Sequence, residues 1–144
     1  MNTSFFGENM NSIGYKRIYL DTSVIVRRPE ILATKNNRIT LIIPSIVHQE
    51  LSRHKSQLFA LVNKAVEDGF AVLEPSPVEF IKTVGGRIHG IDTIILLQAA
   101  KDQKSGTALA SDDRDLIVAG PAAGVSIISS QALVELMAEA EWQQ

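Results

Sequence analysis

The stretch that decides the fold is residues 17–26, which read RIYLDTSVIV. Its first five residues form a short, mostly apolar run that predicts a buried strand ending at Asp21. Outward from it, similar short runs stand at residues 39–43 (ITLII), 70–73 (FAVL), 107–110 (TALA) and 125–128 (VSII). Strands with little polar alternation are buried on both faces, as in parallel sheets covered by helices.

Helical segments separate these runs. Pro29 and Pro44 stand where helices begin, and Gly69 and Gly106 where helices end. We expect helices starting at 29 and at 44–45, one ending at 69, and others over 78–84, 92–104 and 131–142, with a loop at 85–90. Strands that alternate with helices predict an α/β domain with a mostly parallel sheet. We expect residues 1–15 to be a tail and residues 16–144 to be a single domain.

Composition excludes several classes of protein. The 144 residues contain no cysteine, which rules out a disulfide scaffold, a thiol catalyst and a thiolate zinc site. The chain has no apolar run of about 18 residues, so we expect no membrane span. The N-terminal residues lack the pattern of a signal peptide. We therefore expect a cytoplasmic protein without a membrane partner.

Charge is distributed unevenly along the chain. Residues 1–60 carry eight basic and four acidic side chains, whereas residues 61–144 carry six and twelve, for a net charge of −2. Such asymmetry is a weak indication of an anionic partner. Taken alone, the asymmetry is better explained by a solvated surface with chance fluctuation.

Acidic side chains recur at one predicted edge of the sheet. Asp21 ends the first strand, Glu50 lies in the helix after the second, and an acidic cluster follows the fourth. In a parallel α/β sheet the strand ends share one edge, where ligands bind. Crowded carboxylates repel one another unless a cation neutralises them, and Mg²⁺ and Mn²⁺ prefer oxygen ligands. Taken singly, each acid has an ordinary structural explanation: Asp21 could cap a helix or turn, Glu50 could be an exposed helix residue, and the cluster after the fourth strand could be a polar turn.

These residues resemble the PIN domain family of nucleases, which includes VapC-type toxins and eukaryotic RNA-processing enzymes. The matching segments are YLDTSVIV (19–26), IPSIVHQEL (43–51), GIDTIILLQAA (90–100) and ALASDDRDL (108–116), in the family's order. The stretch from Leu20 to Lys55 is most similar to the PIN domains that precede PhoH-type ATPases. The resemblance implies a PIN-like (Rossmann-like) three-layer α/β/α sandwich around a parallel five-stranded sheet.

The resemblance also implies a set of site residues. The catalytic acids would be Asp21, Glu50, Asp92 and Asp113, of which Asp21, Asp92 and Asp113 would bind Mg²⁺ or Mn²⁺. The sequence leaves open whether Asp112 or Asp113 faces the metal. Side chains expected to support the acids by hydrogen bonds are Thr22, Ser23, Ser111, Asp112 and Asp115. The implied activity is metal-dependent hydrolysis of RNA phosphodiester bonds, because a divalent ion activates water and stabilises developing charge.

Basic residues near the acids are candidates for holding an RNA backbone. They are Arg27, Arg28, Arg53 and Lys55. Salt links that offset local negative charge are an equally good interpretation.

Several alternatives stay open. A dehalogenase-like hydrolase needs a second aspartate where Ser23 stands, and a receiver domain needs a phosphorylated aspartate where Glu74-Pro75 stand, so both fit poorly. A non-catalytic PIN-like module that binds RNA or protein is the main alternative to a nuclease. The expected partners are an RNA substrate, an antitoxin or other protein, and further copies of the chain in a dimer or higher oligomer. Toxin and housekeeping roles are not distinguished.

Overall fold

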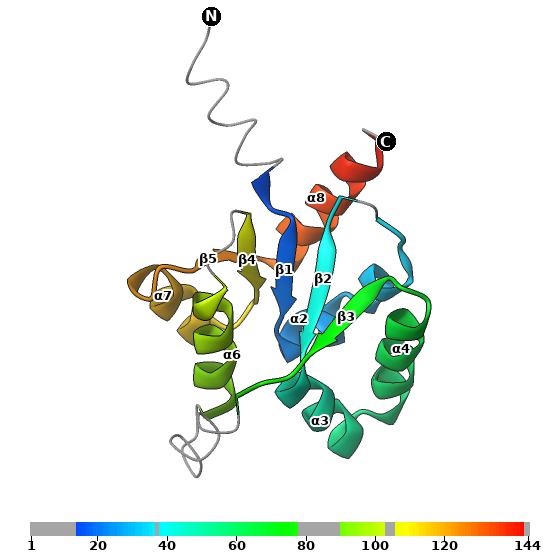
Figure 1. The fold of residues 1–144 in the computed structure, drawn as a ribbon, viewed down its shortest axis with the longest axis horizontal. Coiled ribbons are helices and arrows are strands. Elements are labelled where there is room, and N and C mark those ends of the chain that lie inside the picture. Colours follow the sequence, from blue (N-terminus) through cyan, green and yellow to red (C-terminus); the bar gives the residue numbers. More distant parts are fainter. Residues whose placement is uncertain (1–13, 37, 78–89, 103–105, 143–144) are drawn as a thin grey trace, which may run out of the picture.

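The computed structural model describes residues 14–36, 38–77, 90–102 and 106–142. Within these ranges, five parallel strands form one sheet in the order β3-β2-β1-β4-β5 (Figure 1). The strands are β1 (Arg17–Leu20), β2 (Thr40–Pro44), β3 (Ala71–Glu74), β4 (Thr107–Ala110) and β5 (Ser126–Ile128). The expected helix at 78–84 lies outside the described residues, as do almost all of the expected 85–90 loop and 1–15 tail.

Helices cover both faces of this sheet. They are α2 (Thr22–Arg27), the 3-10 helix η1 (Pro29–Ala33), α3 (Ser45–His54), α4 (Ser56–Glu67), α6 (Gly90–Lys101), α7 (Arg114–Ala122) and α8 (Ser130–Trp142). The chain reverses its direction across the sheet between β3 and β4, so α6 and α7 lie on one face and contact each other. On the other face α2, η1 and α4 are linked by contacts, and α8 lies behind the strands in Figure 1. The predicted three-layer α/β/α fold is confirmed.

The central strands are buried on both sides, as their apolar sequences predict. Ile18, Tyr19 and Leu20 of β1 are all at most 1 % exposed although they alternate between the two faces. In the register of β1 with β4, Leu20 lies opposite Ala110. The next residues, Asp21 and Ser111, therefore leave the sheet side by side.

The structure also contains two helices that the sequence analysis did not predict. Helix α7 begins within the acidic cluster of residues 112–115, and its N-cap Asp113 accepts a hydrogen bond from the backbone N–H of Asp115 in the first turn. Helix α2 has only six residues, and its N-cap Asp21 accepts a hydrogen bond from the backbone N–H of the next residue, Thr22. In both cases a residue predicted for the site also starts a helix. None of the helices in the described ranges combines the length and hydropathy needed to cross a membrane.

Candidate active site

The site lies where β1 and β4 end. These two adjacent strands continue into helices on opposite faces of the sheet, which is the arrangement in which ligands bind at the carboxyl ends of parallel strands. The backbone N–H of Asp21 donates to the carbonyl of Ala110 at 3.1 Å, which extends the strand pairing by one step. The side chain of Asp21 is consequently held beside that of Ser111.

Asp21 is a buried acid surrounded by hydrogen-bond donors. Its side chain is 4 % exposed. Its Oδ1 accepts from the backbone N–H of Thr22, and its Oδ2 accepts from the hydroxyls of Ser23 and Ser111, each at 2.8 Å. Burial raises the pKa of Asp21, the three hydrogen bonds oppose that rise, and the nearby negative charge of Asp113 adds to it. The hydrogen bonds therefore fix the orientation of the Asp21 carboxylate, but they do not fully offset the cost of burying its negative charge.

Asp113 is the acid that lies near Asp21. Its backbone N–H donates to the Ser111 hydroxyl at 3.0 Å, and the same hydroxyl donates to Asp21. Its Oδ1 accepts from the backbone N–H of Asp115 at 2.8 Å. Asp115 thus supports Asp113 through its main chain, while its own side chain is exposed.

Asp112 is directed elsewhere. Its Oδ1 accepts from the backbone N–H of Ser130 at the start of α8 at 2.9 Å, and its Oδ2 lies 3.4 Å from a guanidinium nitrogen of Arg27. Burial opposes ionisation, but hydrogen bonding to Ser130 and the charges of Arg27 and Arg28 outweigh it and lower the pKa of Asp112. Of the two acids whose roles the sequence left open, Asp112 ties α2 to α8 and Asp113 lies beside Asp21.

Glu50 and Asp92 come from the surrounding helices. The Thr22 hydroxyl donates to Glu50 Oε1 at 2.6 Å, and the backbone N–H of Thr22 donates to Asp21, so Thr22 connects the two acids. Asp92 lies in the first turn of α6. Figure 1 shows that α6 begins at the edge of the sheet where β1 passes into α2 and β2 into α3. Within the described ranges, no three acidic or histidine side chains are close enough to form a ready metal cluster.

The predicted basic residues fall into two pairs. Arg27 contacts Asp112, and Arg28 contacts Gln131 and Glu30, so both lie beside the α8 side of the site. Arg53 and Lys55 are exposed at the end of α3. The first pair therefore offsets local acids, whereas the second lies on the surface.

Sequence reasoning missed the buried polar residues Ser76 and Gln98, which connect α3, β3 and α6 beside the site. Gln98 carried a signal, because it interrupts the otherwise apolar run IILLQAA at residues 94–100. A polar residue in such a run is buried together with its hydrogen-bond partner. The partner itself is not visible in the sequence.

Comparisons with known proteins agree with this architecture. Two solved structures share the fold: a PilT N-terminus domain protein from the archaeon Sulfolobus solfataricus P2 (TM-score 0.58, 16 % identity, 86 % of this chain and 92 % of that one), and a domain of a functionally unknown protein from Methanocaldococcus jannaschii DSM 2661 (TM-score 0.51, 19 % identity, 79 % and 90 %). A search of curated proteins returned no match. A family model described as the PIN domain matches residues 18–114, well over half of the sequence. The chain therefore belongs to the PIN domain family and has its nuclease-like fold.

Proposed function

We propose that this protein is a divalent-metal-dependent endoribonuclease whose active site is built around Asp21. The observation that carries the proposal is the environment of that carboxylate in a PIN family chain. Asp21 is buried where β1 ends beside β4, three donors orient it, and the charge of Asp113 acts on it. An uncompensated pair of carboxylates held in this way has an unfavourable energy until a cation joins them.

The donor set fits Mg²⁺ or Mn²⁺. Sites for these ions use one or two carboxylates and leave the remaining positions to water and substrate phosphate. Asp21 and Asp113 would hold the ion directly, and Asp92 would complete the site directly or through water. The bound ion would lower the pKa of a water molecule and stabilise charge on the phosphate.

The other site residues would hold these acids in place or meet the substrate. Ser23 and Ser111 fix the direction of the Asp21 carboxylate, and Thr22 holds Glu50 at 2.6 Å. Glu50 would orient the attacking water. Arg53 and Lys55, which are exposed on α3, would contact the phosphate backbone of the RNA.

The biological setting is part of the same proposal. A cytoplasmic nuclease would act on single-stranded or structured RNA, alone or under the control of an antitoxin or another protein. A homo-oligomer is also expected. Expression of the protein in cells separates the toxin role from a housekeeping role, because a toxin arrests growth and the Asp21→Asn variant relieves that arrest.

The direct test combines metal binding with cleavage. We expect calorimetry to show Mn²⁺ binding to the purified protein and gel assays to show cleavage of single-stranded RNA that a chelator stops. Binding of RNA without Mn²⁺ binding and without cleavage would establish the non-catalytic alternative instead. Cleavage that persists unchanged in excess chelator would exclude the metal-dependent mechanism.

The neighbouring acids Asp112 and Asp113 provide a matched pair of variants. We expect Asp113→Asn to lower the cleavage rate and the Mn²⁺ affinity, each by about 100-fold, as loss of a metal ligand does. Asp112→Asn should instead lower the unfolding temperature, because it weakens the contacts with Ser130 and Arg27. Calorimetry, single-turnover kinetics and thermal unfolding of both variants provide the comparison. Equal losses of metal affinity in the two variants would contradict the assignment.

A further inference from the structure

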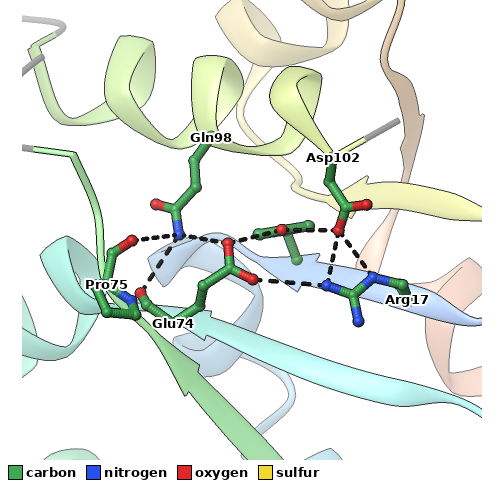
Figure 2. Close-up of polar contacts among 6 residues, drawn as sticks. Arg17, Glu74, Pro75, Gln98 and Asp102 are labelled. Carbon is green, nitrogen blue, oxygen red and sulfur yellow. Dashed lines mark hydrogen bonds and ion pairs between the residues drawn. The ribbon is translucent and has the colours of Figure 1, made fainter. Parts of the chain in front are cut away.

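Gln98 is a buried polar side chain on a helix whose other buried residues are apolar or glycine. It lies in the last turn of α6 and is 4 % exposed. Figure 2 shows its carboxamide directed at the chain that leaves β3. Its Nε2 donates to the carbonyls of Glu74 and Pro75, both at 3.3 Å, and to Glu74 Oε1 at 3.0 Å. Its Oε1 accepts from the Ser76 hydroxyl at 2.7 Å, so both ends of the amide are engaged.

Ser76 extends these contacts to the start of α3. Pro44 precedes this helix and offers no side-chain cap, which leaves the first backbone N–H groups without a local partner. The Ser76 hydroxyl accepts from the backbone N–H of Ile46 at 3.2 Å, and the backbone N–H of Ser76 donates to the Ser45 hydroxyl at 2.8 Å. Ser76 therefore caps α3 from a distant part of the chain.

Glu74 extends the same contacts to β1. The Tyr19 hydroxyl lies 2.8 Å from Glu74 Oε1 and 2.9 Å from Asp102 Oδ2, and Arg17 Nε donates to Asp102 Oδ2 at 2.8 Å (Figure 2). Helix α6 is thus attached to the sheet in its last turn and just beyond its last residue. We call this set the α6 network; it comprises Arg17, Tyr19, Glu74, Ser76, Gln98 and Asp102.

Apolar contacts alone do not determine where α6 lies along the sheet. Its apolar residues are distributed around the helix, with Ile94, Ile95 and Ala99 buried and Leu96 and Leu97 half-buried. Hydrophobic attraction is not directional, so it permits small rotations and shifts of such a helix. Hydrogen bonds need defined distances and angles, and they select one position.

We propose that Gln98 and Ser76 are positioning residues for the active site, an inference that rests on the proposed nuclease function. Asp21 and Asp113 follow β1 and β4 and are placed by the pairing of those strands. Glu50 and Asp92 lie on α3 and α6, which are outside the sheet. Ser76 and Gln98 join these two helices through the end of β3, and this junction sets the distance of Glu50 and Asp92 from Asp21.

The test begins with Gln98→Met, which keeps most of the side-chain volume but loses every hydrogen bond of the amide. We expect kcat for RNA cleavage to fall about 10-fold and Mn²⁺ affinity to weaken by about the same factor, as when the partner of a metal ligand is removed. KM for RNA should change by less than about twofold, because the surface that meets RNA is intact. Leu136→Val on α8 is the control. Helix α8 carries none of the proposed acids, and Leu136 is not part of the α6 network. The substitution removes a buried methylene and should therefore lower stability alone.

A second comparison separates positioning from general stability. In an Asp92→Asn background, Gln98→Met should cause a smaller further loss of single-turnover rate and Mn²⁺ affinity than in the wild type, because only Glu50 is then left to be displaced, while its effect on the unfolding temperature persists. Ser76→Ala should lower kcat as Gln98→Met does, and Ser76→Thr, which keeps the hydroxyl, should restore it.

Three outcomes would overturn the inference: an undiminished kcat in folded Gln98→Met, an equal further loss in the Asp92→Asn background, or a tenfold loss in Leu136→Val. A wild-type protein that neither binds Mn²⁺ nor cleaves RNA would overturn the proposed function, and the positioning role with it.

Discussion

Asp21→Asn is expected to lose RNA cleavage by roughly 10³-fold, equivalent to about 4 kcal/mol of transition-state stabilisation. The same variant should unfold at a higher temperature than the wild type when no metal is present. The two effects share one cause, because Asp21 is a charged group that the fold buries next to the charge of Asp113. Asparagine removes the charge but keeps only one of the two acceptor oxygens, so the removed charge has to outweigh the hydrogen bond lost where the amide group faces a donor. We expect a gain of about 1 kcal/mol, or about 3 °C in Tm.

The pH dependence of this gain has a defined sign. The pKa of Asp21 is raised by burial, so the protonated form is favoured in the folded state. A group with a raised pKa contributes stability that is complete below its unfolded pKa, near about 3.9, and that is lost as pH rises through the folded pKa. The advantage of Asp21→Asn should therefore be largest at neutral pH and disappear in acid. Thermal unfolding in chelator across this pH range measures it.

Two controls make the comparison decisive. Asp112→Asn should behave oppositely, because the pKa of Asp112 is lowered and its charge stabilises the fold above the ordinary carboxyl range. Addition of Mn²⁺ should raise the Tm of the wild type and leave that of Asp21→Asn unchanged, since only a folded state that binds the ion is stabilised by it. A lower Tm for Asp21→Asn than for the wild type, at neutral pH in chelator, would show that the buried charge does not destabilise the folded protein.

The largest loss of stability is expected from Gly106→Ala. Gly106 precedes β4 with a φ of +86°, and its carbonyl accepts from the backbone N–H groups of Lys16 at 2.7 Å and Arg17 at 3.1 Å. A Cβ there would lie 2.0 Å from the carbonyl oxygen of Gly14, a backbone atom that cannot rotate away. Strain and overlap together should cost roughly 3 kcal/mol. Thermal unfolding should show a Tm lower by about 10 °C.

Gly124→Ala is the matched control for this prediction. Gly124 has a similar φ of +76°, but a Cβ would meet nothing within 4 Å. The variant should be destabilised by about 1 kcal/mol, because alanine is strained at a positive φ even where its Cβ has space. The difference between the two variants then reports the close approach of the chain at Gly14 to the turn before β4. Equal losses would show that the start of β1 moves away freely.

The strands could be predicted because a strand that is buried on both faces appears in the sequence as a short, continuous apolar run. The predicted strand at 107–110 matches β4, and the predicted strands at 17–21 and 39–43 differ from β1 and β2 by a single residue at their ends. Helix α7 was not predicted because the aspartates at its start also fit a polar turn, and because Gly120 and Pro121 interrupt its end. Those residues favour turns when they are read locally, and contacts with β5 and α6 overcome that preference.

Only the part of the candidate site that lies at the ends of the strands could be predicted from the sequence. Asp21, Ser111 and Asp113 follow adjacent parallel strands, so their meeting could be predicted from the general rule for such sheets. The choice between Asp112 and Asp113 could not, because it depends on Ser130, a partner 18 residues further along the chain. Gln98 and Ser76 escaped notice for the same reason, since their hydrogen bonds join residues 22 positions apart.

The central place of β1 has a consequence for the protein during its synthesis. β1 is made first, yet one of its two neighbours, β4, is 90 residues away, and Ser111 reaches Asp21 across the same separation. A growing chain that ends before β4 leaves one edge of β1 unpaired and Asp21 without Ser111. Such long-range contacts form late. A ribosome-bound fragment therefore lacks the contact between Asp21 and Ser111, and under the proposed function cleavage of RNA, including the message being translated, would begin only after β4 has emerged.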